Sequence, residues 1–475
     1  MAATFADSAQ APPVAAVLTL GCKLNQAESE AIARELVRAG WQVVDRPAAA
    51  DAYVINSCSV THVADRKSRH LVRLARRLAP AATIVLTGCY PETAGPEVAR
   101  AIGADIVVPS RDKTAVVERL LAHAGNGQRA AGNGGGMLRT RAFVKAQEGC
   151  NDVCAFCIVP RTRGRERSIP PEAVAAVVAA RERDGAQEVV ITGTQLGAYG
   201  RDLDPDRYGP AAVIRAVLAE TSVPRIRFSS LQPQDITPEL LALWDDPRLC
   251  RHFHLALQSG SESVLRRMRR RYTAAQYREA LAMIREYVPD VAVTTDVIVG
   301  FPGETEAEAE ESLTFCREAG FALMHVFPYS RRAGTTANLL KDQVPEPVKR
   351  ARMEEMLAEA ARSAAAFRRR FIGRTLPVLF EAPTTRVRVP HGGEASASIW
   401  EGLTDNYVRV YAAGSADLRN RIVPVRLMDE AEDGLYGTIA GPIAGEPAGA
   451  GAILGAGRPR LPDIRDIIPL LPRQP

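Results

Sequence analysis

The chain has 475 residues, 46% of them apolar and 24% charged, with a formal net charge of +5. This composition is typical of a globular protein of about three domains and excludes a fibrous or largely disordered chain. Eight cysteines in so long a chain exclude a disulfide scaffold. We see no signal peptide and no run of the roughly 20 apolar residues that a membrane helix needs. We therefore expect a cytoplasmic protein with no membrane partner.

Residues 14–123 predict an open parallel α/β sheet, because short apolar runs alternate with helix-like segments. The runs are residues 14–20, 52–55, 83–86 and 105–108. Asn25, followed three residues later by Glu28, predicts the N-cap of the first helix. Before this domain, residues 1–13 predict a disordered lead, and after it the Gly-rich residues 124–138 predict a linker.

Residues 139–370 contain six strand-like runs, each separated from the next by enough chain for a helix. The runs are residues 141–146, 188–192, 225–229, 253–257, 291–299 and 323–327. Each ends in a polar or glycine-bearing turn, and a repeated βα unit of this kind predicts a barrel of TIM type. Six units in place of eight predict a partial, open (β/α)6 barrel. The charged, Ala-rich residues 345–370 predict a long helix that follows it.

Residues 371–440 change to short β runs, about five of them in about 65 residues, which is typical of a small OB-like barrel. The last segment, residues 441–475, is rich in Gly, Ala and Pro and predicts a flexible tail. The whole chain is therefore predicted as an α/β protein with three folded domains.

Cys150, Cys154 and Cys157 stand at C-x₃-C-x₂-C spacing directly after the first apolar run of the central domain. No fourth cysteine follows nearby, whereas closed zinc sites and simple ferredoxin sites take four ligands. Three thiolates on a 4Fe-4S cluster leave one iron open to bind a further molecule. A zinc site completed by a distant histidine, His252 or His254, is the alternative.

Cys22, Cys58 and Cys89 each stand just past the carboxyl end of a different predicted strand. Ligands of open α/β sheets bind at that edge, so the three thiols are expected to share one rim. Any single one of them could instead be a buried cysteine that acts as a small hydrophobe. All three at one topological position favour a second metal centre with three protein ligands.

The cysteine motif at 150–157, with Phe156 before its last cysteine, resembles the radical S-adenosylmethionine (radical SAM) superfamily. Cys22, Cys58 and Cys89 narrow the resemblance to the methylthiotransferases. Supporting motifs stand in order at residues 19–26, 56–58, 87–89, 149–151, 258–261 and 296–305. The C-terminal barrel resembles the TRAM domain that ends these enzymes and contacts RNA.

The resemblance implies two 4Fe-4S clusters, one on Cys150, Cys154 and Cys157 and an auxiliary one on the other three cysteines. The first would bind S-adenosylmethionine and cleave it to a 5′-deoxyadenosyl radical. The second would carry a sulfur atom that a first S-adenosylmethionine methylates. The radical then abstracts hydrogen from C2 of an adenine in the anticodon arm of tRNA, and the methylthio group is transferred there. An electron donor such as flavodoxin or ferredoxin is implied.

Within this resemblance, the residues expected to bind S-adenosylmethionine are Phe156, Thr192, Gly193, Gln195, Ser229, Gln258 and Asp296. Gln195 departs from the family, which often has Asn or His there. Arg331 and Arg332 are expected to reach RNA phosphate or the carboxylate of the substrate. Basic runs at residues 66–77 and 266–271 suit phosphate contact or a solvated helix face. Cys250 and Cys316 fit no ligand set and are expected to be structural.

Gly-Cys-Lys-Leu-Asn-Gln at residues 21–26 most resembles the branch of the family that acts on N6-threonylcarbamoyladenosine. The stretch at residues 402–410 also resembles the TRAM segment of that branch. The alternatives are the sister branches, which modify N6-isopentenyladenosine in tRNA or a ribosomal protein. A non-catalytic, metal-bearing RNA-binding protein is the alternative from another class.

Overall fold

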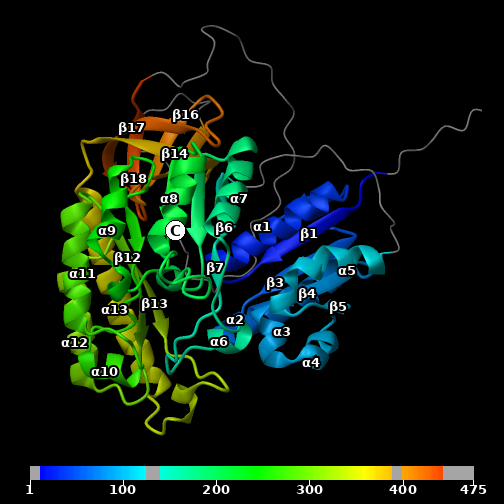
Figure 1. The fold of residues 1–475 in the computed structure, drawn as a ribbon, viewed down its shortest axis with the longest axis horizontal. Coiled ribbons are helices and arrows are strands. Elements are labelled where there is room, and N and C mark those ends of the chain that lie inside the picture. The colour runs from blue at the N-terminus through cyan, green and yellow to red at the C-terminus, as the bar shows by residue number, and fades with distance from the viewer. Residues whose placement is uncertain (1–10, 125–139, 388–397, 442–475) are drawn as a thin grey trace, which may run out of the picture. The chain divides into compact units, whose positions relative to one another are not determined.

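The computed structural model describes residues 11–124, 140–387 and 398–441 (Figure 1). Within these residues, the chain forms two compact units. The N-terminal unit comprises residues 11–124 together with the short segment Arg161–Gly164, and the second unit comprises the rest. The predicted lead at residues 1–13, linker at 124–138 and tail at 441–475 lie almost entirely outside the described residues.

The N-terminal unit is built on a five-stranded parallel sheet of order β2-β1-β3-β4-β5. Its strands are β1 (Val14–Thr19), β2 (Gln42–Val44), β3 (Ala52–Ser57), β4 (Thr83–Gly88) and β5 (Ile106–Val107). The three central strands are apolar and buried, which suits a parallel sheet covered on both faces. The predicted open α/β sheet is confirmed, with β2 as an edge strand that the sequence pattern did not indicate.

The helices of this unit are α1 (Lys23–Arg38), α2 (His62–Leu78), α3 (Cys89–Ala94), α4 (Pro96–Ala101) and α5 (Val116–His123), with a 3₁₀ turn η1 (Ser110–Ala115). The predicted N-cap at Asn25 is wrong, because α1 already begins at Lys23. The Asn25 amide instead donates hydrogen bonds to the carbonyls of Leu20, at 2.6 Å, and Ser57, at 3.0 Å. Asn25 thereby joins the ends of β1 and β3.

The second unit contains the six predicted strands in two parallel three-stranded sheets of order β10-β9-β6 and β11-β12-β13. They are β6 (Arg141–Lys145), β9 (Glu188–Thr192), β10 (Arg225–Phe228), β11 (His252–His254), β12 (Ala292–Val299) and β13 (Leu323–Pro328). Isolated bridges from Ile226 to Leu249 and from Leu231 to Leu255 join β10 to the next sheet. Six parallel strands therefore follow one another in chain order, as an open (β/α)6 barrel requires.

Strand β11 is shorter than the predicted run at residues 253–257. The Thr295 hydroxyl accepts a hydrogen bond from the Leu257 amide at 2.9 Å and donates one to the Leu255 carbonyl at 2.6 Å. A side chain thus takes part in the hydrogen bonding that follows this strand, and backbone pairing with β12 resumes at Gln258, which forms a bridge to Val297.

The main helices of the core are α7 (Pro171–Arg183), α8 (Pro210–Glu220), α11 (Ala274–Tyr287), α12 (Glu306–Ala319) and α13 (Glu346–Arg369). Shorter elements are α6 (Val159–Thr162), α9 (Pro238–Leu241), α10 (Glu262–Arg267), η2 (Leu196–Ala198), η3 (Pro233–Asp235), η4 (Ala242–Asp245) and η5 (Thr336–Leu339), with a β7–β8 ribbon (Gln147–Glu148 and Arg167–Ser168). Capping boxes at Thr273 and Thr305 fix the starts of α11 and α12.

The C-terminal residues of this unit form a closed five-stranded barrel of order β14-β15-β16-β18-β17. Its strands are β14 (Thr375–Pro383), β15 (Ser398–Thr404), β16 (Arg409–Gly414), β17 (Ile422–Glu430) and β18 (Leu435–Ile439). Phe367 and Phe371, at the end of the long helix α13, share its apolar core. The five predicted runs are therefore confirmed as one small barrel.

The small barrel is attached to the core at the beginnings of the core strands. Arg225 donates to the Leu403 carbonyl at 2.9 Å, and Arg227 donates to the Asp405 carbonyl at 3.0 Å. Arg251, just before β11, pairs with the Asp405 carboxylate at 2.6 Å. The opposite ends of these strands stay available for chemistry. None of the described helices combines the length and apolar character that crossing a bilayer requires.

Candidate functional site

The loop that carries Cys150, Cys154 and Cys157 follows β6 and β7 at the carboxyl end of the first core strand. Gln147, at its start, is fully buried and makes four hydrogen bonds. Its amide donates to the carbonyls of Glu148 and Gly149, and its oxygen accepts from the Thr194 and Gln195 amides at 3.0 and 3.1 Å. Gln147 therefore fixes the cysteine loop to the turn after β9.

Polar groups surround the cysteine sulfurs. The Asp152 amide donates to Cys150 Sγ at 3.4 Å, and that sulfur also lies 3.4 Å from Gln195 Oε1. Burial raises the pKa of Cys150 to about 11 and that of Cys157 to about 12, so both are neutral thiols without a metal. Binding a metal would displace these protons, and backbone N–H donors to sulfur suit the thiolates that result.

The arginine run at residues 266–271 divides into separate roles. Arg270 Nη1 donates to Cys154 Sγ at 3.2 Å, and Arg271 pairs with Asp152 at 2.9 Å. Arg267 pairs with Glu308 at 2.7 Å, whereas Arg266 and Arg269 are exposed. The run is therefore not a uniform solvated face, because two of its members hold the cysteine loop.

The predicted cofactor residues of β9 and β10 lie at the carboxyl ends of those strands. Thr192 and Ser229 are buried, and the Ser229 hydroxyl donates to the Ile191 carbonyl at 3.4 Å. A Cβ at Gly193 would lie 2.8 Å from Leu196 and 3.0 Å from Gln147 Oε1, so this close packing requires glycine. Within the described residues, the buried Thr194 hydroxyl has no hydrogen-bond partner.

Two non-glycine residues at the strand ends have left-handed backbone, Ser230 with φ 69° and Gln258 with φ 68°. Such conformations cost energy and are concentrated at functional sites. Asp296 lies on β12, and its backbone carbonyl accepts a hydrogen bond from the Gln258 amide at 2.8 Å. Its carboxylate lies 3.3 Å from His254 Nε2. Phe156 packs on a small apolar cluster that includes Met268 and Phe301.

Arg331 is exposed and donates to the Asn338 side chain at 3.3 Å, whereas Arg332 beside it is buried. Of this pair, only Arg331 therefore presents its guanidinium to solvent. Cys250 and Cys316 are buried in the core, and burial raises the pKa of each to about 12.

The other three cysteines follow adjacent strands, because β1, β3 and β4 are neighbours in the sheet. Cys22 follows β1, Cys58 follows β3 and Cys89 follows β4. A Cβ at Gly21 would lie 3.0 Å from Cys58 Sγ. Burial, followed by the charges of Cys89 and Cys22, raises the pKa of Cys58 to about 12. The structure therefore brings the predicted second set together on one rim.

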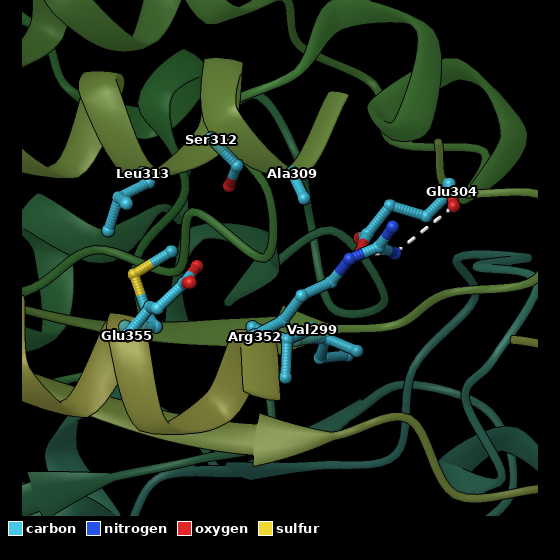
Figure 2. A pocket seen from close by; sticks show the side chains of 9 residues that line it. Val299, Glu304, Ala309, Ser312, Leu313, Arg352 and Glu355 are labelled. Carbon is cyan, nitrogen blue, oxygen red and sulfur yellow. Dashed lines mark hydrogen bonds and ion pairs between the residues drawn. The ribbon is translucent and has the colours of Figure 1, made fainter. Parts of the chain in front are cut away.

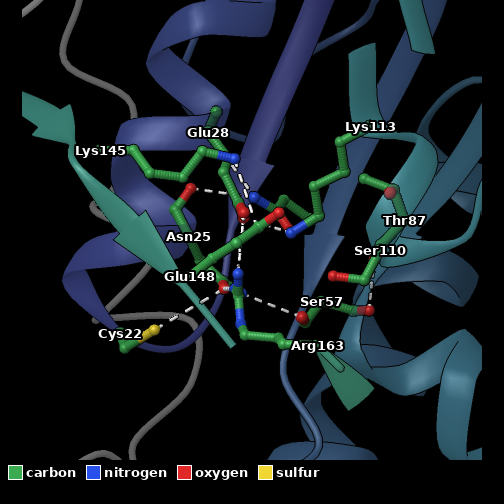
Figure 3. A network of polar contacts seen from close by, with 12 residues as sticks. Cys22, Asn25, Glu28, Ser57, Thr87, Ser110, Lys113, Lys145, Glu148 and Arg163 are labelled. Carbon is green, nitrogen blue, oxygen red and sulfur yellow. Dashed lines mark hydrogen bonds and ion pairs between the residues drawn. The ribbon is translucent and has the colours of Figure 1, made fainter. Parts of the chain in front are cut away.

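A buried polar network lies beside this rim (Figure 3). Glu28 of α1 pairs with Arg163 at 2.8 Å and also with Lys113, and Arg163 further donates to Asn25. All three charged side chains are at most 7% exposed. Burial lowers the pKa of Lys113, and Glu28 offsets this only in part because Arg163 adds a second positive charge. The network leaves net positive charge near Cys22 and Cys89.

The histidines of the zinc alternative have other partners. His252 Nε2 lies 3.0 Å from the Thr294 hydroxyl, and His254 contacts Thr294 and Asp296. Across residues 11–124, 140–387 and 398–441, no three Cys, His, Asp or Glu side chains surround one point suited to a single metal ion. Cysteines on a 4Fe-4S cluster bind different irons, so they need not converge in that way.

A small hollow lies between α12, α13 and the end of β12 (Figure 2). Its walls include the Glu304–Arg352 ion pair, at 2.8 Å, and Met356. None of the predicted site residues lines it, and its ion pair helps to anchor the turn after β12 through the Gly300 amide.

Two family models match the two units. The model described as "Radical SAM superfamily" matches residues 144–316, and "Uncharacterized protein family UPF0004" matches residues 15–109. "Threonylcarbamoyladenosine tRNA methylthiotransferase MtaB" of Bacillus subtilis is 37% identical over 426 residues, covering 86% of this chain and 92% of that protein. The chain belongs to the radical SAM tRNA methylthiotransferase family. Membership implies S-adenosylmethionine and a 4Fe-4S cluster as cofactors.

Further relatives come from a second group of this methylthiotransferase family. "tRNA-2-methylthio-N(6)-dimethylallyladenosine synthase" of Sorangium cellulosum is 34% identical over 455 residues, covering 87% of this chain and 91% of that protein. The solved radical S-adenosylmethionine methyltransferase TsrM of Kitasatospora setae covers 69% of this chain and 77% of its own, with 13% identity and a TM-score of 0.49.

The positions of both cysteine sets at strand ends could be predicted from the sequence, because strand ends can be read from apolar runs. The sequence reasoning missed Gln147, the individual role of Arg270, and the Glu28–Arg163–Lys113 network. A glutamine directly before a cysteine motif, as at Gln147, is a usable signal. The other contacts join residues 85 to 138 positions apart in the chain and had no local signal.

Proposed function

We propose that this enzyme transfers a methylthio group to C2 of N6-threonylcarbamoyladenosine beside the anticodon of tRNA. The observation that carries the proposal is a pair of cysteine triplets. Cys150, Cys154 and Cys157 lie on one loop at the carboxyl end of the first core strand, and Cys22, Cys58 and Cys89 follow three neighbouring parallel strands. The relative named for threonylcarbamoyladenosine, which covers most of both chains, supports the choice of substrate.

Cys150, Cys154 and Cys157 would hold one 4Fe-4S cluster, and Cys22, Cys58 and Cys89 would hold a second. When bound, the clusters and S-adenosylmethionine would supply radical chemistry and a transferable methylthio group. The residues of this chain would bind and orient these groups and would exclude water from them. Gln147 would keep the first cysteine loop against the β9 turn, and the Asp152 amide would donate to the Cys150 thiolate.

S-adenosylmethionine would lie along the strand ends that carry the left-handed residues. Thr192, Gly193 and Ser229 would form one wall, with the unpaired Thr194 hydroxyl beside it. Gln195, Gln258 and Asp296 would offer polar groups to the ligand, and Phe156 would provide an apolar surface. Gly193 lets the turn after β9 pack against Leu196 and Gln147, which keeps this wall beside the cysteine loop.

The RNA would be held by basic side chains and by the C-terminal barrel. Exposed Arg331 would contact phosphate or the threonylcarbamoyl carboxylate, with Arg332 supporting it from its buried position. A one-electron donor such as flavodoxin or ferredoxin would reduce the enzyme, which would work in the cytoplasm with tRNA as its partner.

Iron analysis of anaerobically reconstituted protein tests the two-cluster assignment. We expect about eight irons per wild-type chain and about four in each of the variants C22A/C58A/C89A and C150A/C154A/C157A. About four irons in the wild-type chain, unchanged by C22A/C58A/C89A, would remove the second cluster.

Mass spectrometry of tRNA nucleosides from a deletion strain tests the substrate. We expect threonylcarbamoyladenosine to lose its methylthio group and complementation with the wild-type gene to restore it. The second candidate substrate is N6-isopentenyladenosine, favoured by the relatives named for dimethylallyladenosine at 31–34% identity. Loss of the methylthio group from that nucleoside instead would reverse the assignment.

A further inference from the structure

Arg270 stands apart from the other arginines of its run because its guanidinium points at a cysteine sulfur. Nη1 donates to Cys154 Sγ at 3.2 Å and Nη2 donates to Gln232 Oε1 at 3.0 Å. Nε donates to the Tyr272 hydroxyl at 3.1 Å, and the guanidinium carbon lies 4.8 Å from the centre of the Tyr272 ring. Every nitrogen of the side chain is thereby assigned to a partner.

These partners are themselves fixed. The Tyr272 hydroxyl donates to the Ala256 and Leu257 carbonyls, which lie directly before Gln258 at the end of the fourth core strand. The Gln232 amide donates to the Asp152 carboxylate at 3.2 Å, inside the cysteine loop. A backbone hydrogen bond also joins the cysteine loop to the segment at residues 266–271, because the Ala155 amide donates to the Met268 carbonyl at 2.9 Å. The direction of the guanidinium therefore follows from the fold.

The charge of Arg270 is not balanced by a direct acidic partner. Among the described residues, no carboxylate lies within 4.0 Å of its guanidinium, and the neighbouring Asp152 pairs with Arg271. A partly buried cation without a carboxylate partner is costly unless an anion is present. A 4Fe-4S cluster on three thiolates carries net negative charge, and one further electron increases it.

We propose that Arg270 is a positioning residue that sets the reduction potential of the cluster held by Cys150, Cys154 and Cys157. This inference rests on the proposed assignment of those cysteines as ligands. Arg270 supplies an N–H···S hydrogen bond and a positive charge on the Cys154 side. Hydrogen bonds to sulfur and local charge are among the properties that set such potentials. Both favour the reduced state, which carries one electron more, delivered by a one-electron protein donor.

The test is a dithionite titration followed by electron paramagnetic resonance, in a full-length C22A/C58A/C89A chain so that only one cluster contributes. The variants are R270Q, R270K and R266Q in that background. For R270Q we expect about a tenfold lower ratio of reduced to oxidised cluster at a fixed potential, or about 59 mV for a one-electron couple. R270K keeps the charge and should shift less.

R266Q is the matched control, because Arg266 belongs to the same arginine run, carries the same charge and is exposed to solvent. We expect it to leave the potential unchanged. An unshifted R270Q, or an R266Q that shifts as far, would overturn the proposal. If R270Q binds no iron but R270K does, the charge role is supported. If neither R270Q nor R270K binds iron, while the metal-free chains keep the melting temperature of the parent, Arg270 has a structural role and the proposal is overturned.

The parent chain separates this proposal from the one it rests on. About four irons in C22A/C58A/C89A establish that Cys150, Cys154 and Cys157 hold a cluster, whatever the arginine variants do. A parent chain without iron would overturn both the ligand assignment and the role of Arg270.

Discussion

The Arg163 guanidinium pairs with both oxygens of the Glu28 carboxylate, Nη1 with Oε1 at 2.8 Å and Nη2 with Oε2 at 3.2 Å. Lys113 pairs with the same carboxylate, so one buried anion serves two buried cations. Since breaking a buried pair leaves an uncompensated charge, E28Q should destabilise the N-terminal unit by about 3–5 kcal/mol. Hydrogen exchange of the β1 and β3 amides measures this loss.

Two further variants sharpen that prediction. K113M leaves a balanced Glu28–Arg163 pair and should cost less than E28Q. E239Q removes an exposed pair, Glu239 with Arg215 at 2.8 Å, and should change stability by about 0–1 kcal/mol. A K113M variant as unstable as E28Q would show that charge balance is not what the network provides.

Gly88 holds the turn that leads into Cys89. Its φ is +95°, and a Cβ there would lie 2.3 Å from the Ser57 carbonyl oxygen, a backbone atom that cannot move aside cheaply. G88A should therefore cost about 3 kcal/mol or more from clash and strain together. Gly95 provides the control, because its φ is +85° but a Cβ would meet nothing within 4 Å. G95A should cost only about 1–2 kcal/mol of backbone strain in the same exchange measurement.

Gln147 is expected to couple the cysteine loop to ligand binding. Q147A leaves the buried Thr194 and Gln195 amides without acceptors, at about 1–3 kcal/mol each. Q147E keeps the acceptor but sets a carboxylate oxygen against the Gly149 carbonyl. Both variants should lower the melting temperature and weaken S-adenosylmethionine binding by about tenfold, about 1.4 kcal/mol, in calorimetry of the reconstituted protein. Q42A, at an exposed position on β2, should change neither the melting temperature nor the affinity for S-adenosylmethionine. Wild-type affinity in Q147A would refute the coupling.

Asp235 predicts a pH dependence of stability. Burial raises its pKa from 3.8 to about 6, with a hydrogen bond from the Gln232 amide opposing the shift. An acid whose folded-state pKa is raised stabilises the fold fully below its unfolded pKa, and that contribution is lost as pH rises through the folded pKa. The unfolding free energy should therefore fall between pH 3.8 and about 6, by up to about 3 kcal/mol.

D235N should remove this decline, because the amide does not titrate and can still accept from Gln232. Urea titrations of both proteins between pH 4 and 7 compare the slopes. Parallel slopes for wild type and D235N would assign the pH dependence to other groups.

Strands and cysteine placement could be predicted because each depends on local pattern. An apolar run marks a strand, and parallel strands present their carboxyl ends at one edge, so Cys22, Cys58 and Cys89 were brought together without any coordinates. The exceptions involve side chains. The Thr295 side chain takes part in the hydrogen bonding that follows the short strand β11, and Asn25 lies inside α1 because its amide joins two strand ends.

The electrostatic partners could not be predicted, because nothing local distinguishes them. Five arginines crowd residues 266–271, and their directions depend on a left-handed turn at Arg269, with φ 58°. That turn sends Arg270 and Arg271 toward the cysteine loop. Arg163 stands among several arginines after the motif, yet it alone of the described ones pairs with Glu28, 135 positions earlier.

The small C-terminal barrel has a consequence for synthesis of the protein on the ribosome. Arg227 and Glu188, paired at 2.9 Å at the beginnings of core strands, are covered by residues 404–407, and Phe371 is buried among barrel strands. The barrel closes only when β18, ending at Ile439, pairs with β16 and β17. While some 200 residues after Arg227 are being translated, the beginnings of the newly made core strands, including Arg227 and Glu188, therefore lack the cover that the barrel provides. Chaperone demand should be greatest during that interval.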